Sequence, residues 1–315
     1  MRLPLAAFLT ALLALPARAV NFDQGAKGMS TGDFLQLGPG ARAAGLGEAY
    51  SAAADDATAL YWNPAAITRI PKRSVTVMHA EYVAESYFDY AAAVQNLGNW
   101  GSVGVGAQYF SAGAIPQTDA AGVSMGDFRP YGMAATFGYA NTFHDIDLME
   151  DFNGVSIGAS AKLVRSAIVD HDSTVAFDVG LLTPEYFERL RAALTVTNLG
   201  RGLRFDQEYA PLPLTFRLGT AWKLLPGWMA ACDVVFPRHN RIYPNVGTEY
   251  SWAANPGLTL SGRAGYNGVA VGDIQGFSSL ALGAGAAFHG VSVDYGFLPL
   301  GGLGQAHRVS LTFGF

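Results

Sequence analysis

Two short segments of the chain have the G-x-S-x-G pattern that surrounds the nucleophilic serine of many hydrolases. They are "GVSMG" at residues 122–126 and "GVSIG" at residues 154–158. The pattern indicates acyl-transfer chemistry only where the serine stands on a sharp turn between a strand and a helix. Neither segment has that context, since Ser156 lies within a strand-like run, and the 38 glycines of the chain make chance matches frequent. We therefore expect no catalytic residue and no enzyme activity.

The histidines are the other residues that could do chemistry, as metal ligands. The six are His79, His144, His171, His239, His289 and His307, and they do not have the spacing of a metal site. The segment "GPGARA" at residues 38–43 follows no strand and so lacks the context of a dinucleotide site. We expect no metal and no cofactor. The formal net charge of −5 also gives no sign of a basic surface for a nucleic acid.

Charged side chains recur within segments that alternate between apolar and polar residues. Ten of these side chains are expected on the more polar faces of the alternating segments: Asp89, Lys162, Asp178, Arg217, Lys223, Asp233, Glu249, Arg263, Asp294 and Arg308. If the apolar faces meet lipid, these charges point into the lumen of a barrel, because a charge on a lipid face is costly. Five are acidic and five are basic. This balance favours ion pairs across a packed or plugged interior over an ion filter of a single sign.

About fourteen such alternating segments follow residue 72. They lie near residues 74–82, 86–95, 100–110, 130–140, 154–163, 172–182, 191–199, 213–223, 228–236, 245–253, 257–266, 277–288, 290–297 and 306–315. Most have the roughly 9–11 residues that a membrane-spanning strand needs, whereas strands of a soluble sandwich average about 5–6 residues. Only 14% of the residues are charged and 50% are hydrophobic. We predict an all-β fold, a transmembrane antiparallel β-barrel of about fourteen strands.

The first nineteen residues have the features of a signal peptide. Arg2 precedes an apolar run, and residues 17–19 form a small-x-small cleavage site. Cleavage near Ala19, together with a barrel fold, predicts the outer membrane of a Gram-negative cell. The sequence therefore divides into a signal peptide at 1–19, an N-terminal segment at 20–71 and a barrel at 72–315.

The N-terminal segment contains "GLGEAYSAAADDATALYWNPAAI" at residues 45–67, which predicts short helices. A first helix is expected from about Glu48 to Ala54, and two aspartates can cap a second one. Asn63 can cap a third helix, with a proline at its first position. Pieces so short and so poor in charge are expected to be buried in the barrel lumen as a plug, or hatch. The candidate site residues of the plug are Asp55, Asp56, Tyr61, Trp62, Asn63, Pro64 and Ala65.

The chain ends on "RVSLTFGF", an alternating segment with a terminal aromatic residue. This ending resembles the signal by which the barrel-assembly machinery of the outer membrane recognises its clients. The candidate residues of that signal are Phe313 and Phe315. The expected partners are therefore this machinery and outer-membrane lipid.

A longer resemblance covers residues 35–67, "LQLGPGARAAGLGEAYSAAADDATALYWNPAAI". This run resembles the N-terminal signature of the PorV/PorQ family, within the wider superfamily of FadL-like, UPF0164-type barrels. That superfamily has an Asn-Pro-Ala element, here residues 63–65, in an N-terminal hatch that plugs a fourteen-stranded barrel. The resemblance implies a non-enzymatic barrel.

Two functions follow from this resemblance and stay open at this point. The preferred one is a membrane partner or shuttle in protein secretion to the cell surface, of the type IX kind, with secretion components or secreted cargo as partners. The alternative is a FadL-like transporter of hydrophobic small molecules such as long-chain fatty acids. For transport, we expect an apolar pocket of acyl-chain size beside Tyr61, Trp62 and Ile67.

Overall fold

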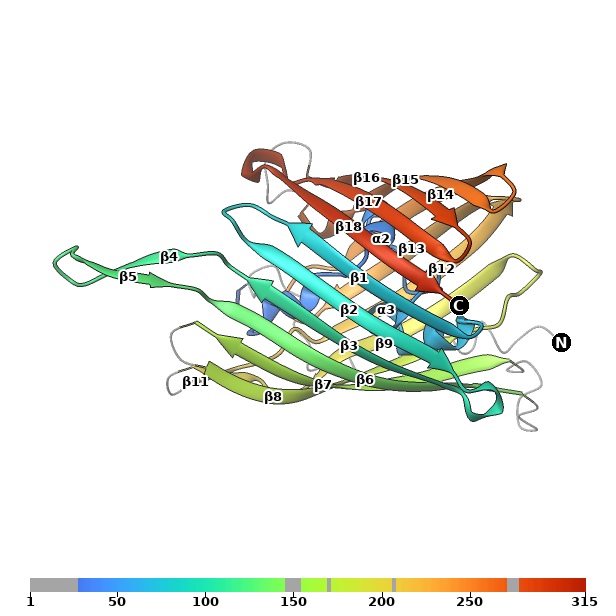
Figure 1. The fold of residues 1–315 in the computed structure, drawn as a ribbon. Helices are drawn as coiled ribbons and strands as arrows, with labels where there is room; N and C mark the ends of the chain where they lie inside the picture. Colours follow the sequence, from blue (N-terminus) through green and yellow to red (C-terminus); the bar gives the residue numbers. More distant parts are fainter. Residues whose placement is uncertain (1–27, 145–153, 169–170, 206–207, 271–277) are drawn as a thin grey trace.

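The computed structural model describes residues 28–144, 154–168, 171–205, 208–270 and 278–315. Fourteen strands form a closed barrel in which each strand is antiparallel to both neighbours (Figure 1). The strands are β1 (Arg73–Glu81), β2 (Tyr87–Asn96), β3 (Ser102–Ser111), β6 (Tyr131–Phe143), β7 (Val155–Ala167), β8 (His171–Leu182), β9 (Leu190–Gly200), β12 (Thr215–Leu225), β13 (Trp228–Pro237), β14 (Tyr243–Asn255), β15 (Leu258–Asn267), β16 (Leu280–Phe288), β17 (Val291–Pro299) and β18 (Gln305–Gly314). The first and last of them pair with each other and close the sheet. The predicted all-β barrel is therefore confirmed.

The strands alternate between a lumen-facing and an outward-facing row of side chains, as the sequence predicts. On β7, Ser160 and Lys162 are buried, whereas Ile157 is 42% exposed and Leu163 is 66% exposed. Apolar side chains therefore cover the outside of the barrel, where lipid would contact them. Among the described residues, no helix has both the length and the apolar composition needed to cross a membrane.

Two short hairpins lie outside the barrel sheet. β4 (Ile115–Thr118) pairs with β5 (Ser124–Phe128), and β10 (Leu203–Phe205) pairs with β11 (Glu208–Ala210). The first hairpin projects well beyond the rim of the barrel (Figure 1), and we call this end of the barrel the hairpin end. Three single-turn helices occupy other connections: η4 (Gly98–Trp100), η6 (Gly268–Ala270) and η7 (Gly301–Leu303).

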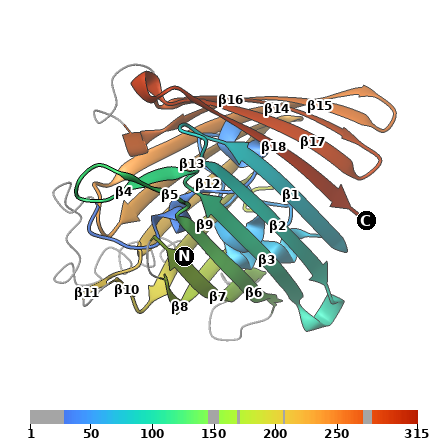
Figure 2. The ribbon, with the colours of Figure 1, turned by 60° about the vertical axis from the view of Figure 1, so that its left-hand side comes forward.

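The residues before β1 fill the lumen. They form η2 (Asp33–Gln36), α2 (Ala41–Gly45), α3 (Ala59–Trp62) and η3 (Pro64–Arg69), connected by turns and enclosed by the strands (Figures 1 and 2). Most side chains of this plug from residue 41 to residue 70 are buried. The turn after η3 leads directly into β1, so the plug and the wall are continuous in the chain.

The predicted Ala-rich helix from Glu48 to Ala54 is wrong. The helix of this region is α2, which ends at Gly45, and residues 46–48 and 51–53 form turns instead. Gly47 and Glu48 both have left-handed backbone conformations, with φ of 63° and 65°. Two consecutive residues in that conformation end a right-handed helix.

The plug contacts the wall closely because several lumen-facing residues of the wall are glycines. Gly265 of β15 and Gly247 of β14 lie directly against the plug backbone at Leu46 and Gly47. A methyl group at either glycine would overlap these backbone atoms. Backbone therefore packs on backbone at this point, with no space for a side chain between plug and wall.

Candidate functional site

The Asn-Pro-Ala element forms hydrogen bonds with other parts of the plug and with the wall of the barrel. The Asn63 side-chain oxygen accepts a hydrogen bond of 3.0 Å from the Ala65 backbone N–H, and Pro64 takes the first position of η3. The Asn63 side-chain amide donates to the backbone oxygens of Ser51, at 3.1 Å, and Leu181 of β8, at 3.2 Å. The predicted N-cap is therefore present, and the same side chain attaches the plug to the wall.

The two neighbouring aspartates of the plug have different roles. Asp56 accepts hydrogen bonds from the backbone N–H of Thr58, at 2.8 Å, and from the Tyr50 hydroxyl, at 3.0 Å. The N-cap of α3 is Thr58, with no hydrogen bond from a capping side chain, so Asp56 holds the turn before this helix and does not cap it as predicted. Burial first, and then the charge of Asp55, raise the pKa of the Asp56 carboxyl group above its usual value.

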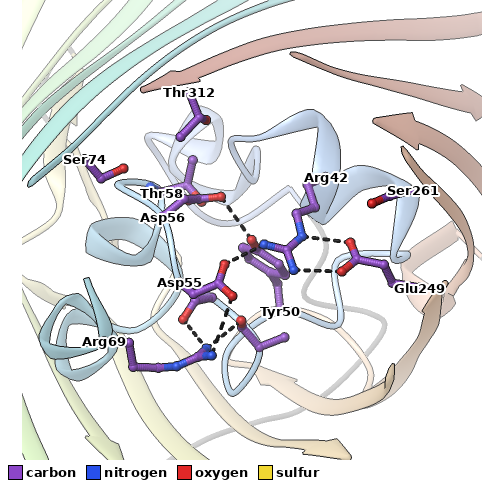
Figure 3. Close-up of polar contacts among 12 residues, drawn as sticks. Arg42, Tyr50, Asp55, Asp56, Thr58, Arg69, Ser74, Glu249, Ser261 and Thr312 are labelled. Atoms are coloured by element: carbon purple, nitrogen blue, oxygen red, sulfur yellow. Dashed lines mark hydrogen bonds and ion pairs between the residues drawn. The ribbon is translucent and has the colours of Figure 1, made fainter. Parts of the chain in front are cut away.

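Asp55 points away from α3 and toward two arginines (Figure 3). It forms ion pairs with Arg42 and with Arg69, the latter at 3.6 Å. Arg42 also donates to the Glu249 carboxylate of β14, with two contacts of 2.8 Å. Burial acts to raise the pKa of Asp55, but the two guanidinium groups outweigh it, so the pKa is lowered. The prediction that Asp55 caps a helix is not met, since its partners are charges distant in sequence.

Of the ten charged residues predicted to face the lumen, eight do so, and each of the eight forms an ion pair. Four of the pairs they form are Lys162–Asp178 at 2.7 Å, Arg217–Asp233 at 3.2 Å, Arg263–Asp294 at 2.6 Å and Arg308 with Glu48 of the plug at 3.2 Å. Arg263 also pairs with Glu249. The lumen is therefore held by ion pairs between wall and wall and between wall and plug, as the balance of charge predicted.

Two of the ten differ. Lys223 faces the lumen side but lies at the open end of β12, where it is 53% exposed and pairs with Glu185. The prediction for Asp89 is wrong, because its side chain faces outward and contacts the His79 ring at 2.6 Å. The reason is that the lumen face of β2 packs on the apolar plug through Phe88 and Tyr90, so both faces of this strand carry apolar residues.

The first part of the plug occupies an apolar pocket near the hairpin end. Phe34 and Leu35 of η2 pack on five buried residues, namely Ala134, Val164, Ala176, Leu203 and Leu212. The Phe34 ring lies directly on Gly132 of β6, where a methyl group would overlap it. No motif marks this pocket in the sequence, because its walls come from four strands, β6, β7, β8 and β10, and from Leu212 in the connection before β12.

A small polar cavity adjoins this pocket. It has a volume of about 30 Å³, and Leu35 lines it together with Tyr61, Trp62 and Lys162. The expected pocket of acyl-chain size is absent at this place in the described residues, since drug-sized ligands need about 300 Å³ or more. Ile67 is fully buried and does not line the cavity.

The cavity wall contains a β-bulge between β8 and β9, at Asp178. Asp178 accepts from the backbone N–H of Asn198 at 2.8 Å, and Asn198 has a left-handed backbone with φ of 63°. Lys162 donates to the Asn198 side-chain oxygen at 3.0 Å. The bulge therefore brings one carboxylate, one ammonium group and one amide together on the lumen face.

The plug has two differently held parts. From Gly38 onward it is attached to the wall through many polar contacts, among them Ala41 N–H to the Ser310 hydroxyl at 2.7 Å and Ala57 N–H to the Ser74 hydroxyl at 3.1 Å. The η2 segment is held by Thr31, whose N–H and hydroxyl donate to the backbone oxygens of Pro211 and Ala210, and by the Tyr61 hydroxyl, which donates to the Leu35 oxygen.

Comparison of the sequence with models of protein families assigns the chain to a family. A model of a family described as "Uncharacterised protein family (UPF0164)" matches residues 10–174, just over half of the 315 residues. The chain belongs to UPF0164. Comparison with curated proteins finds no relative that matches this UPF0164 member.

Solved structures with a similar fold are outer-membrane channels and transporters. The Pseudomonas putida toluene transporter TodX has a TM-score of 0.54 and 13% identity, over 87% of this chain and 96% of that one. A Pseudomonas aeruginosa FadL homologue has a TM-score of 0.55 and 12% identity, over 87% and 98%. The CymD monoaromatic hydrocarbon channel has a TM-score of 0.55 and 12% identity, over 89% and 98%. This UPF0164 chain therefore has a FadL-type barrel fold.

Proposed function

We propose that this protein is an outer-membrane channel for small hydrophobic compounds and that its plug closes the channel in the described state. Two similar structures are a toluene transporter and a monoaromatic hydrocarbon channel, which supports this class of compound. The fold supplies a closed wall with an apolar outside and a filled lumen. An apolar compound would cross this lumen only where apolar side chains can be displaced.

The observation that carries the proposal is the position of Phe34. Its phenyl ring lies on Gly132 and belongs to a buried apolar cluster that includes Leu203 and Leu212. A benzene-sized compound has the shape and the polarity of this ring. The chain thus holds one of its own aromatic rings in the place that we assign to the ligand.

The way the plug is held supports the same proposal. Displacement of η2 breaks the contacts of Thr31 and Leu35, whereas displacement of the rest of the plug breaks buried ion pairs. Removal of one partner of a buried pair costs about 3–5 kcal/mol, far more than the loss of an ordinary hydrogen bond. We therefore assign opening to residues 28–37, which include η2.

Influx of toluene into proteoliposomes tests the proposal. We expect wild-type protein to speed influx over protein-free vesicles, and Phe34→Ala to increase it several-fold, because the competing ring is gone. Phe187→Ala is the matched control, since Phe187 is 91% exposed and far from any buried cluster. If folded wild-type protein and Phe34→Ala both give the influx of empty vesicles, the proposal is wrong.

Protein secretion is a second candidate function, supported by the β4–β5 hairpin. This hairpin projects from the rim, and its Val123 and Met125 side chains are 61% and 64% exposed, which suits contact with another protein. The PorV/PorQ resemblance assigns secretion components or cargo to that role. Purification of the tagged protein from native membranes would test it. We expect Val123→Ser with Met125→Ser to lose such partners while toluene influx is retained, and retention of the partners would count against this role.

A further inference from the structure

We propose that the preferred compounds are neutral aromatic molecules that carry one hydroxyl group, such as phenols. This inference rests on the proposed function, because it assumes that a ligand takes the place of Phe34 and Leu35. It adds a chemical class that the pocket alone does not specify. It is supported by the spacing of the wall residues, by a tyrosine hydroxyl that loses its hydrogen-bond acceptor when the plug segment moves, and by the pairing of the nearby charges.

The apolar pocket and the polar cavity are neighbouring levels of the same strands. Val164 and Lys162 are two residues apart on the lumen face of β7, and Ala176 and Asp178 are two residues apart on β8. Two residues along a strand span about 6.6 Å. A ring in the apolar level would therefore direct a substituent on its edge into the polar level. Leu35 contacts both levels and marks the connection between them.

The Tyr61 hydroxyl lacks its acceptor once η2 has moved. In the closed state it donates a hydrogen bond of 2.9 Å to the Leu35 backbone oxygen. Burial raises the pKa of Tyr61 above its usual value, so the group stays a neutral donor. A ligand hydroxyl oxygen could accept this bond, whereas a plain hydrocarbon would leave a buried donor unpaired, at a cost of about 1–3 kcal/mol.

The charges around the cavity disfavour a carboxylate. Lys162 is already paired with Asp178, and Arg217 with Asp233. The third charged residue of the described lining, Glu48, is paired with Arg308, so it gives an anion no attraction either. An incoming carboxylate would thus lose its hydration without gaining an unpaired cation. A neutral hydroxyl group requires no countercharge.

Three compounds that share a methyl-substituted benzene ring test this inference: toluene, p-cresol and p-toluate, of which the last two carry a second group para to the methyl. Binding is measured by competition on the full-length protein in lipid nanodiscs at pH 7, where p-toluate is ionised. We expect p-cresol to bind about tenfold more tightly than toluene, the effect of one net hydrogen bond. We expect p-toluate to bind most weakly.

The Tyr61→Phe variant isolates the donor. It should lose the preference for p-cresol while its affinity for toluene is retained. Tyr90→Phe is the matched control, because Tyr90 is a buried lumen tyrosine of β2 that does not line the cavity. The ranking of the three compounds by wild-type protein is informative even where Tyr61→Phe does not fold.

Each result has a distinct meaning. Equal binding of toluene and p-cresol overturns the inference and leaves the proposed channel function intact. Tightest binding of p-toluate also overturns it and indicates a channel for acids. Binding of none of the three contradicts the proposed function itself.

Discussion

At the scale of single residues, the plug shows which roles local sequence can predict. Asn63 was assigned as a helix cap from its position before Pro64, and its hydrogen bond to Ala65 confirms this, since capping depends only on residues two or three positions away. Asp55 and Asp56 could not be told apart in this way. The partners of Asp55, Arg42 and Arg69, come from other turns of the plug, and only the folded lumen brings them together.

The two aspartates predict opposite responses to pH. The pKa of Asp55 is lowered in the folded state, so its contribution to stability is present above its usual value of 3.8 and is lost as pH falls through the lowered value. The pKa of Asp56 is raised, so its charge costs stability at neutral pH, and that cost disappears as pH falls through the raised value. At pH 7 we therefore expect Asp55→Asn to be less stable than Asp56→Asn.

Urea unfolding in detergent from pH 3 to pH 8 measures this difference. Asp55→Asn should lose about 1 kcal/mol at pH 7, a modest value because its side chain is 37% exposed and water screens the ion pairs. Asp56→Asn should lose less or gain. The gap should narrow as pH falls, first through the raised pKa of Asp56 and then below pH 3.8, where Asp55 of the unfolded chain takes up its proton before the folded one does. A larger loss for Asp56→Asn at pH 7 would contradict the assignment.

At the scale of elements, the strands were predictable and the close contacts between plug and wall were not. Alternation on β7 and its neighbours gives the strand and its faces, because a lipid-facing row and a lumen-facing row differ in polarity. On β2 this rule failed at Asp89, since the plug presents an apolar surface to that strand. The apolar pocket of Phe34 was also missed, because its walls come from elements far apart in sequence.

Substitution of two glycines of β15 tests how closely the plug packs against the barrel wall. Gly265 faces the plug backbone, whereas the position of a methyl group on Gly262 has no atom within 4 Å. We expect Gly265→Ala to destabilise the folded protein by about 1–3 kcal/mol or more, because the plug has to shift. Gly262→Ala should stay within about 0.5 kcal/mol of wild type. Urea unfolding and limited proteolysis of the plug compare the two, and equal behaviour would show that the contact at Gly265 is not tight.

At the scale of the whole molecule, the protein is a barrel whose lumen is filled by its own N-terminal segment. Eight of the charged wall residues predicted from the sequence line that lumen, four acidic and four basic, namely Asp178, Asp233, Glu249, Asp294, Lys162, Arg217, Arg263 and Arg308. These acidic and basic side chains form ion pairs with one another, so they do not form a filter for ions of a single sign. Fold class and strand number followed from the sequence, whereas the apolar pocket of Phe34 is assembled only by the fold.

This balance of charge predicts the electrical behaviour of the barrel. In planar bilayers we expect wild-type protein to give no steady ion conductance, because the plug and the ion pairs fill the lumen. A variant that lacks residues 28–70 should conduct and discriminate little between potassium and chloride, since these eight lumen charges are four of each sign. Steady wild-type conductance as large as that of the variant would mean that the plug does not close the lumen.

The direct junction between plug and wall limits how the protein can open. η3 ends at Arg69 and β1 begins at Arg73, so the three residues between them reach about 10 Å at most. β1 in turn is joined to β18, with Arg73 and Phe315 exchanging backbone hydrogen bonds. The plug is thus covalently attached to the barrel at the seam where β1 and β18 pair and close the sheet. Under the proposed function, the plug cannot leave the lumen as a whole while the seam is intact, and η2, which carries Phe34, is the described helix of the plug farthest along the chain from this seam.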